Sequence, residues 1–494
     1  MKKSLLVTLI TAAVGYAGQP LTLTLDQAIE TALQNNTRLK ISRIGLQIAD
    51  AQYQQALSAR YPTLDLTAGM QRRDEPLNSL NKGTIQLDKQ TSRLFLLTGA
   101  HNQDLAGQKL GQIPPNQSPN FDHALQQIMS GQTPSFSFPY SADVLVTGRD
   151  TYRADLDLSY PLFTGGKVGA VIRRASLNKT IRHEGIRRTR AQVIYDTRRY
   201  YYAVRLAEIM RDEIHITLER LKLIRDLTEA FYKGRSLKVK KTDYLRTLVA
   251  VDLAQSAYEE AVSRVRSAKA ALVNTMGLPW NSRIEIAQKR FDTPEASPAL
   301  EKLIDQAYRY NPDYAKLRLA IRVSGEKIKE RKSAYLPKIG LQAGLHRFDS
   351  DQEGGLNTPQ NRNAWTIGVG LSWNLFSGFR DKHRIEEARL NQHAYEEKEV
   401  YLKEGLALQV KAAFIDLDKG IRQYKALHNA VNHAKENAEL NIRAYRAEMV
   451  ETKDVIEAQI METFVKTAYY RALHDYADTR ALIDFIIARS VGRD

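Results

Sequence analysis

The sequence predicts a mainly α-helical chain that also carries four strands of a transmembrane β-barrel, arranged as an internal duplication. Three observations predict this fold class. One helix-to-strand segment occurs twice, very long stretches with helical periodicity flank the strands, and four short stretches alternate apolar and polar residues. A fold of this class places long antiparallel helical hairpins next to a small number of strands.

The duplication is visible as similar segments that occur twice in the same order. The two pairs are 58–62 with 333–337 (SARYP and SAYLP) and 158–165 with 371–378 (LSYPLFTG and LSWNLFSG). After a leader, two structural repeats, 18–277 and 278–494, therefore share one architecture.

The first repeat contains an insertion, because Pro62 is much further from Leu162 along the chain than Pro337 is from Leu375. The insertion lies at about 74–148 and is rich in Pro, Gly, Asn and Gln, which interrupt regular structure. We expect a loop that joins two strands.

Residues 1–17 have the pattern of a secretory signal peptide. Two lysines precede an apolar run from Leu5 to Val14, and small residues precede a cleavage point after Ala17. The alternative, an amphipathic start of a cytoplasmic protein, requires a polar face that this run lacks. Elsewhere no stretch has the ~18 apolar residues of a spanning helix, so strands or the surface would make any membrane contact.

Four stretches, 62–73, 151–163, 337–348 and 364–376, alternate apolar and polar residues. Each has about the length of a tilted strand that crosses a bilayer. A half-buried sheet in a soluble protein gives the same alternation, but aromatic residues near the strand ends resemble an interfacial girdle. These aromatics are Tyr61, Tyr160, Phe163, Tyr335, Trp365, Trp373 and Phe376. Because four strands cannot close a barrel and an open edge in lipid is costly, the chain must oligomerise.

The remaining segments have helical periodicity. The stretches 165–231 and 378–445 lack proline and predict helices about 100 Å long. Each continues into a shorter return helix, so that two hairpins are expected at 165–277 and 378–490. Single helices of about 50 Å are expected at 25–60 and 300–334, before the first strand of each repeat.

Neither the composition nor the motifs of the sequence indicate an enzyme. The chain has no cysteine, which excludes disulfides, thiol catalysis and thiolate metal sites. Its formal charge of +16 comes from basic residues dispersed among acidic ones, as on solvated helices rather than a nucleic-acid-binding surface. His183-Glu184 lacks the second histidine of a zinc-protease motif, and Gly165-Gly166-Lys167 lacks the remainder of a phosphate loop. We therefore predict no catalytic residue, no cofactor and no metal.

Several motifs recur in the same order in both repeats. They are Ala32-Leu33-x-x-Asn36 and Ala307-x-x-x-Asn311-Pro312, Pro62 and Pro337, YPLFTGG at 160–166 and WNLFSG at 373–378, with Gly277-Leu278-Pro279 closing the first repeat. Together they resemble the TolC family of outer-membrane efflux and secretion channels.

The resemblance implies a homotrimer whose twelve strands form one barrel in the outer-membrane lipid of a Gram-negative bacterium. It also implies a helical tunnel, or α-barrel, that extends through the periplasm. Such a channel is a passive conduit for small molecules or proteins. Its partners are a periplasmic adaptor (membrane fusion) protein and an inner-membrane efflux pump or ABC exporter. On this topology the 74–148 insertion is extracellular.

The resemblance also implies two sets of functional residues. Glu436 and Glu439 match an acidic pair that constricts the tunnel, and their spacing puts both on one helical face; the alternative is two surface glutamates. The hairpin tips would contact the adaptor, or else be solvated turns. The tip residues are Gly234, Lys238, Lys240, Lys241, Glu448 and Met449.

The alternative function is that of a soluble periplasmic coiled-coil scaffold or surface-binding protein. It predicts a helical rod in the soluble periplasmic fraction, whereas a channel requires detergent and conducts ions. A nucleic-acid-binding helical protein is a third interpretation, and it requires that residues 1–17 are not a signal.

Overall fold

The computed structural model describes residues 20–79, 83–86, 137–140, 144–234, 238–288, 290–296 and 298–488. They form two compact units. The sheet unit comprises the described parts of 59–165 and 335–375, and the helical unit comprises the others. The predicted signal peptide and most of the 74–148 insertion lie outside the described residues.

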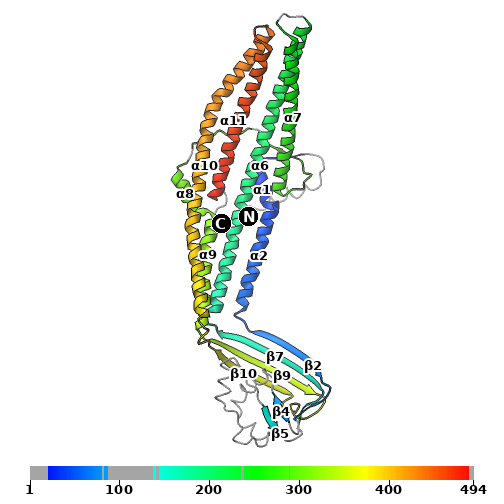
Figure 1. The fold of residues 1–494 in the computed structure, drawn as a ribbon, viewed down its shortest axis with the longest axis vertical. Helices are drawn as coiled ribbons and strands as arrows, with labels where there is room; N and C mark the ends of the chain where they lie inside the picture. The colour runs from blue at the N-terminus through cyan, green and yellow to red at the C-terminus, as the bar shows by residue number, and fades with distance from the viewer. Residues whose placement is uncertain are drawn as a thin grey trace, which may run out of the picture. The chain divides into compact units, whose positions relative to one another are not determined.

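Two long hairpins dominate the helical unit. Helices α6 (Lys167–Lys233) and α10 (Arg380–Arg446) each have 67 residues, which corresponds to about 100 Å. The return helices are α7 (Lys241–Met276) and α11 (Thr452–Ile486). Figure 1 shows the two hairpins side by side, with α11 next to α6. The predicted long antiparallel hairpins are therefore confirmed.

The shorter helices are broken, so the expectation of single helices at 25–60 and 300–334 is wrong. The first segment divides into α1 (Leu25–Asn35) and α2 (Thr37–Ser58). The second divides into α8 (Leu300–Tyr310) and α9 (Pro312–Lys332). The break falls at the same position of each repeat, at Asn36 and Asn311, where ψ is 123° and 122°.

Side-chain hydrogen bonds explain both breaks. The Oδ1 atom of Asn36 accepts hydrogen bonds from the amides of Arg38 and Leu39, and that of Asn311 accepts from the two equivalent amides. This is an N-cap, which starts a new helix. The amide Nδ2 of Asn36 donates to the carbonyl of Thr275 at 2.7 Å, and that of Asn311 donates to Ile486 at 2.9 Å. Each asparagine thus joins the break to the last turn of its return helix.

Each repeat has its own apolar core where the broken helix meets the long hairpin. In the first repeat, Tyr201, Leu272 and Met276 are buried with Ala28 and Ala32. A two-stranded parallel ladder, β1 (Leu21–Leu23) and β8 (Ile284–Ile286), covers this core. The second core is equivalent and includes Ala307, Leu406, Val410, Leu417, Ile483 and Ile487.

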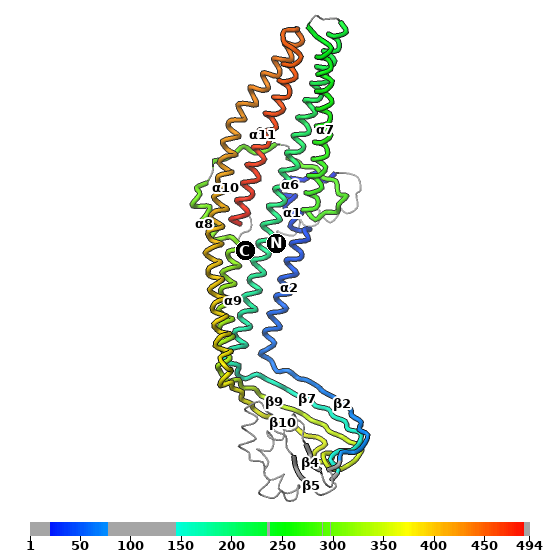
Figure 2. Tube along the Cα trace, in the orientation of Figure 1, coloured from blue at the N-terminus to red at the C-terminus, as the bar shows by residue number. Residues whose placement is uncertain are grey.

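The sheet unit contains a four-stranded antiparallel sheet in the order β10-β9-β7-β2. Figure 2 shows β7 between β2 and β9. The strands are β2 (Thr63–Arg72), β7 (Asp150–Phe163), β9 (Lys338–Ser350) and β10 (Asn363–Ser372). Every residue of the edge strands β2 and β10 is exposed.

The 74–148 insertion contains regular structure that we did not expect. Four short strands form two antiparallel ladders, although the sequence predicts only a loop. The ladders pair β3 (Leu77–Ser79) with β6 (Val144–Thr147), and β4 (Gly83–Gln86) with β5 (Ser137–Tyr140). The paired strands are far apart in the sequence, so local turn residues do not reveal the pairing.

Within the described part of the chain, every helix falls short of the length and apolar character needed to cross a membrane.

Candidate functional site

The tip of the second hairpin is a closed turn that holds Glu448 in an unusual conformation. Helix α10 ends at Arg446, and Glu448 has φ +55°. The Met449 amide donates back to the carbonyl of Ala444 at 2.8 Å. This left-handed position normally favours glycine, so a glutamate here has a conformational cost. Met449 follows with 78% of its surface exposed.

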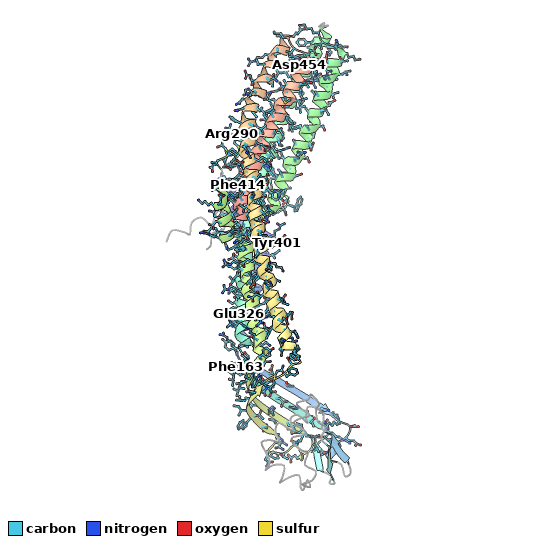
Figure 3. The ribbon with its side chains drawn as sticks, turned by 60° about the vertical axis from the view of Figure 1, so that its left-hand side comes forward. Phe163, Arg290, Glu326, Tyr401, Phe414 and Asp454 are labelled. Atoms are coloured by element: carbon cyan, nitrogen blue, oxygen red, sulfur yellow. The ribbon has the colours of Figure 1, made fainter. Side chains whose placement is uncertain are left out.

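The return helix α11 begins directly after this turn. The Asp454 carboxylate accepts a hydrogen bond from the backbone amide of Glu451 at 3.2 Å, and Figure 3 shows Asp454 at this tip. An acidic side chain in the first turn also stabilises the positive end of the helix dipole.

The tip of the first hairpin is basic and has a different geometry. The Gly234 amide donates to the carbonyl of Ala230 at 2.8 Å, and φ is −73°, so the turn does not need a left-handed residue here. The backbone amide of Lys240 donates to the Asp243 carboxylate at 3.0 Å. The side chains of Lys240 and Lys241 are exposed. Residues 235–237 lie outside the described part of the chain.

The structure joins the two tips to each other. The Nζ atom of Lys238 donates to the Glu448 carbonyl at 2.8 Å. Beneath this contact, the hydroxyl of Tyr445 lies 2.6 Å from that of Thr228 and 3.0 Å from that of Thr452. Tyr445 is buried in an apolar cluster shared by both hairpins. Lys238 is thus a structural contact as well as part of the basic tip.

Glu436 and Glu439 lie on α10, outside the packed face of the helix. Ala434 and Ala438 are buried, and Glu436, midway between them along the helix, points to the opposite side. The Glu436 carboxylate is exposed and has no ion-pair partner among the described residues. The charge of Glu439 is partly neutralised, because Lys435 and Arg443 each lie 3.9 Å from its carboxylate. The two glutamates are therefore not equivalent.

A buried polar network that the sequence did not reveal lies between α6 and α11. Glu462, which is 2% exposed, pairs with Arg220 and lies 2.8 Å from Nζ of Lys466. Lys466 also pairs with Glu213 at 2.9 Å. Burial alone would lower the pKa of Lys466, but hydrogen bonds to Glu462 and Glu213 outweigh burial and raise it. The network fixes the two hairpins against each other.

The sheet has one apolar and one polar face. Leu64, Leu66 and Met70 on β2 are exposed, as are Ile367 and Val369 on β10. On the other face of the sheet, the Asp155 carboxylate lies 2.9 Å from Nδ1 of His346. An exposed apolar face on a strand whose other face is polar is typical of contact with lipid or with another protein.

Most of the predicted girdle residues lie near one end of the sheet. Tyr61 and Tyr335 precede β2 and β9, Tyr160 and Phe163 end β7, and Trp373 follows β10. The Trp373 indole donates to the Tyr335 carbonyl at 3.1 Å. Trp365 lies nearer the start of β10, opposite Leu345. Phe376 belongs to the helical unit, where it packs edge-on against Phe379.

The described residues contain no group of three or more side chains that could hold a metal ion. His183 and Glu184 lie on α6 within a long helical surface. Neither they nor the carboxylates described above form an arrangement of nucleophile, base and orienting group.

A protein-family match falls within the second repeat. Residues 303–487 match the family described as outer membrane efflux protein. The alkaline protease secretion protein AprF of Pseudomonas aeruginosa is 27% identical over 239 residues. That match covers 46% of this chain, and the chain spans only 47% of the length of AprF.

Solved structures of outer-membrane channels have the same fold over nearly the whole chain. The CmeC outer membrane channel of Campylobacter jejuni has a TM-score of 0.70 at 15% identity, covering 95% of this chain and 87% of CmeC. The outer membrane protein VceC of Vibrio cholerae has a TM-score of 0.69 at 13% identity, covering 94% and 96%. The open state of the MtrE channel of Neisseria gonorrhoeae has a TM-score of 0.68 at 16% identity, covering 95% and 90%.

These comparisons confirm the predicted resemblance and the predicted fold class. They also support the predicted outer-membrane location. The matched family and the solved relatives are channels rather than enzymes.

Proposed function

We propose that this chain, which carries an outer membrane efflux protein domain on the fold of the outer-membrane channels, is one subunit of a passive export channel. The domain match and the shared fold support this function. The observation that most directly supports this function is that the four-stranded sheet of one chain does not close on itself.

The sheet cannot stand alone in a membrane. Among the described residues, the edge strands β2 and β10 each pair on one side only, and each backbone group left unpaired costs several kcal/mol in hydrocarbon. Because the four strands alternate in direction, β10 of one copy would run antiparallel to β2 of the next. Cyclic repetition therefore closes an antiparallel barrel, and three copies give twelve strands.

The long hairpins supply the wall of a tunnel in this proposal. The faces that do not pack carry many charged residues, which suit the lining of a water-filled conduit, together with exposed apolar side chains such as Leu253 and Leu408. The chain performs no catalysis, and an inner-membrane pump or ABC exporter supplies the energy. The name of AprF supports protein secretion for that relative. For this chain, the proposal includes both small molecules and proteins as exported cargo.

The gate and the partner surface are part of the same proposal. Glu436 and Glu439 from several copies would form an acidic ring that selects cations. The exposed ammonium groups of Lys240 and Lys241 and the thioether of Met449 would contact a periplasmic adaptor. Lys238 and Gly234 would position the tip rather than contact the adaptor.

Purification and conductance test the proposed function. The channel should remain in the membrane fraction, require detergent, sediment as a trimer and produce ion conductance in planar lipid bilayers. A soluble monomer without conductance would contradict the proposal and favour the periplasmic scaffold.

A further inference from the structure

The helical unit contains a pocket between α6, α9 and α10 with a volume of about 410 Å³. This volume lies in the range of sites that hold small organic ligands. Arg331 and Arg384 line it together with Arg174 and Lys327, and among the described residues of its wall only Glu387 is acidic. Four cations and one carboxylate give the lining a positive charge.

The directions of the three helices separate charged and apolar residues within the pocket. Ion pairs Arg174–Glu330 and Arg188–Asp313 show that α6 and α9 are antiparallel. Contacts of α9 with α10 show the same, because the Tyr314 hydroxyl binds Glu399 while Gly325 lies near Gln392.

The antiparallel arrangement creates an amphipathic pocket. On α9, Arg331 comes after Val323, whereas on α10, Arg384 comes before Tyr395, and on α6, Arg174 comes before Ile181. The cations therefore gather at one end, and Ile181, Val323 and Tyr395 gather at the other. Figure 3 labels Glu326 on α9, directly before the lining residue Lys327.

Two arginines at the charged end are available to a ligand. Arg174 and Lys327 share the carboxylate of Glu330. The Arg384 guanidinium is 3.6 Å from Asp381 and is exposed. Among the described residues, Arg331 has no ion-pair partner. An arginine fork binds carboxylate, sulfate or phosphate with two parallel hydrogen bonds.

The cations of the pocket could simply be required by the fold. The internal duplication tests this alternative, because the first repeat forms equivalent helices. In the alignment that matches Pro62 with Pro337, Lys327 and Arg331 correspond to Gln52 and Ala56 on α2. In the alignment of the two long helices that matches 158–165 with 371–378, Arg384 corresponds to Val171 on α6. The first repeat builds the same helices without the three cations, so they are a specific property of the second repeat.

We propose that this pocket binds an amphipathic organic anion. The anionic group lies between Arg331 and Arg384, and the apolar body packs against Val323, Ile181 and Tyr395. The site is formed within one chain, so it goes beyond the proposed channel function and does not depend on ion conduction. The same chemistry occurs in a free organic anion and in the headgroup region of an anionic lipid.

Calorimetric titration of the full-length protein in amphipol with 2-naphthalenesulfonate tests the site. We expect binding to the wild type and at least a tenfold loss of affinity in Arg331→Gln/Arg384→Gln. The matched control is Arg322→Gln/Arg389→Gln, which removes two exposed arginines of the same helices outside the pocket and should leave affinity unchanged. Thermal unfolding of both variants checks that the fold is intact.

Two further titrations test the amphipathic character. The uncharged analogue 2-naphthalenemethanol should bind at least tenfold more weakly and should not distinguish the two double variants. Tyr395→Ala should lower the affinity for 2-naphthalenesulfonate while leaving the affinity for inorganic sulfate unchanged. Equal binding of the sulfonate to the wild type and the pocket variant, or equal binding of the neutral alcohol, would overturn the proposal.

Native mass spectrometry of protein purified directly from membranes identifies the source of the ligand. An anionic lipid retained by the wild type and lost from Arg331→Gln/Arg384→Gln supports the proposal with lipid as the source. Sulfonate binding without retained lipid supports a free anion. These measurements do not depend on conductance. A protein that binds the probe but does not conduct ions would therefore contradict the proposed channel function and leave the proposed binding site supported.

Discussion

At the residue scale, Asn36 and Asn311 show how one side chain sets the geometry of each repeat. Each is buried, caps a new helix through Oδ1 and binds the last turn of the return helix through Nδ2. A buried polar group without its partner costs about 1–3 kcal/mol, so both functions contribute to stability.

Replacing these asparagines should separate the two functions. We expect Asn36→Ala to lower the free energy of unfolding by roughly 2–3 kcal/mol, because it removes a cap and leaves the Thr275 carbonyl without its donor. Asn36→Asp retains the cap but loses the donor, so its effect should be large as well. Denaturant unfolding measures both variants. Asn441→Ala, which removes a half-buried amide that bonds, among the described residues, only to Asn437 of its own helix, is the control, and an equal loss there would contradict this interpretation.

Asp478 on α11 illustrates the opposite case, a side chain whose charge opposes folding. Burial raises the pKa of its carboxyl, although the positive charge of Arg199 partly opposes that shift. Because the pKa is raised in the folded state, ionisation of Asp478 costs stability at neutral pH. That cost disappears as the pH falls through the raised pKa and towards the ordinary value.

The variant Asp478→Asn should therefore be more stable than the wild type at pH 7, since it keeps an oxygen acceptor for Tyr195 without the charge. The advantage should shrink as the pH approaches 4. Thermal unfolding between pH 4 and pH 8 provides the measurement. Glu457→Gln, at an exposed carboxylate of the same helix, should show no such pH-dependent gain; a constant difference for Asp478→Asn would contradict the burial argument.

The unequal surroundings of Glu436 and Glu439 lead to a prediction about the proposed gate. Lys435 and Arg443 partly neutralise Glu439, so Glu436 should dominate the cation selectivity of the pore. We expect Glu436→Gln to lower cation selectivity more than Glu439→Gln, and the double variant to lower it most. Reversal potentials in salt gradients across planar bilayers measure the effect. Unchanged currents in the double variant would remove both residues from the gate.

At the element scale, the periodicity of the sequence predicted the long helices and the four long strands, because both patterns repeat over many residues. It did not predict the helix breaks at Asn36 and Asn311, although both asparagines belong to recognised motifs. Their second partners, Thr275 and Ile486, are 239 and 175 residues away. The caps themselves are local, because each Oδ1 accepts from amides two and three residues further on. The bonds that hold the two asparagines against the return helices leave no local pattern.

The candidate site could be predicted only in part for the same reason. The basic residues of the first tip and the spacing of Glu436 and Glu439 are visible in the sequence. The contact of Lys238 with Glu448, 210 residues away, and the network of Arg220 with Glu462 depend on how the two hairpins pack. Sequence alone therefore assigned Lys238 to the same role as Lys240 and Lys241.

The hairpin tips yield a prediction that separates these lysines. We expect Lys240→Gln/Lys241→Gln to weaken export while leaving the proposed trimer intact, because both side chains are exposed. Lys238→Gln should loosen the tips and change the conductance of the purified protein even without a partner. Accumulation of ethidium and the profile of secreted proteins measure export in the parent bacterium. Wild-type export by the double variant would favour a merely solvated tip.

At the scale of the whole molecule, the proposed trimer rests on the exposed apolar faces of β2 and β10 and on their open edges among the described residues. The absence of cysteine from the sequence makes the proposed edge pairing directly testable, because any engineered pair of thiols is unique.

Three double variants combine Thr67→Cys on β2 with a cysteine on β10, at Thr366→Cys, Gly368→Cys or Gly370→Cys. Oxidation should form a disulfide between β2 of one copy and β10 of the next. All four positions lie on the polar face of the sheet, so one register should bring the thiols within disulfide distance. Denaturing gels should then show covalent dimers and trimers. Thr67→Cys with Val369→Cys places the thiols on opposite faces and is the control; absence of cross-links in every same-face pair would contradict edge pairing.

The unequal tips of the two hairpins also bear on stoichiometry. In a ring of three chains, six tips alternate between a basic kind and a kind that presents Met449. A partner that recognises one kind binds as three copies per ring, whereas a partner that accepts both kinds binds as six. The number of partner molecules in an isolated complex would therefore reveal whether the partner recognises one kind of tip or both.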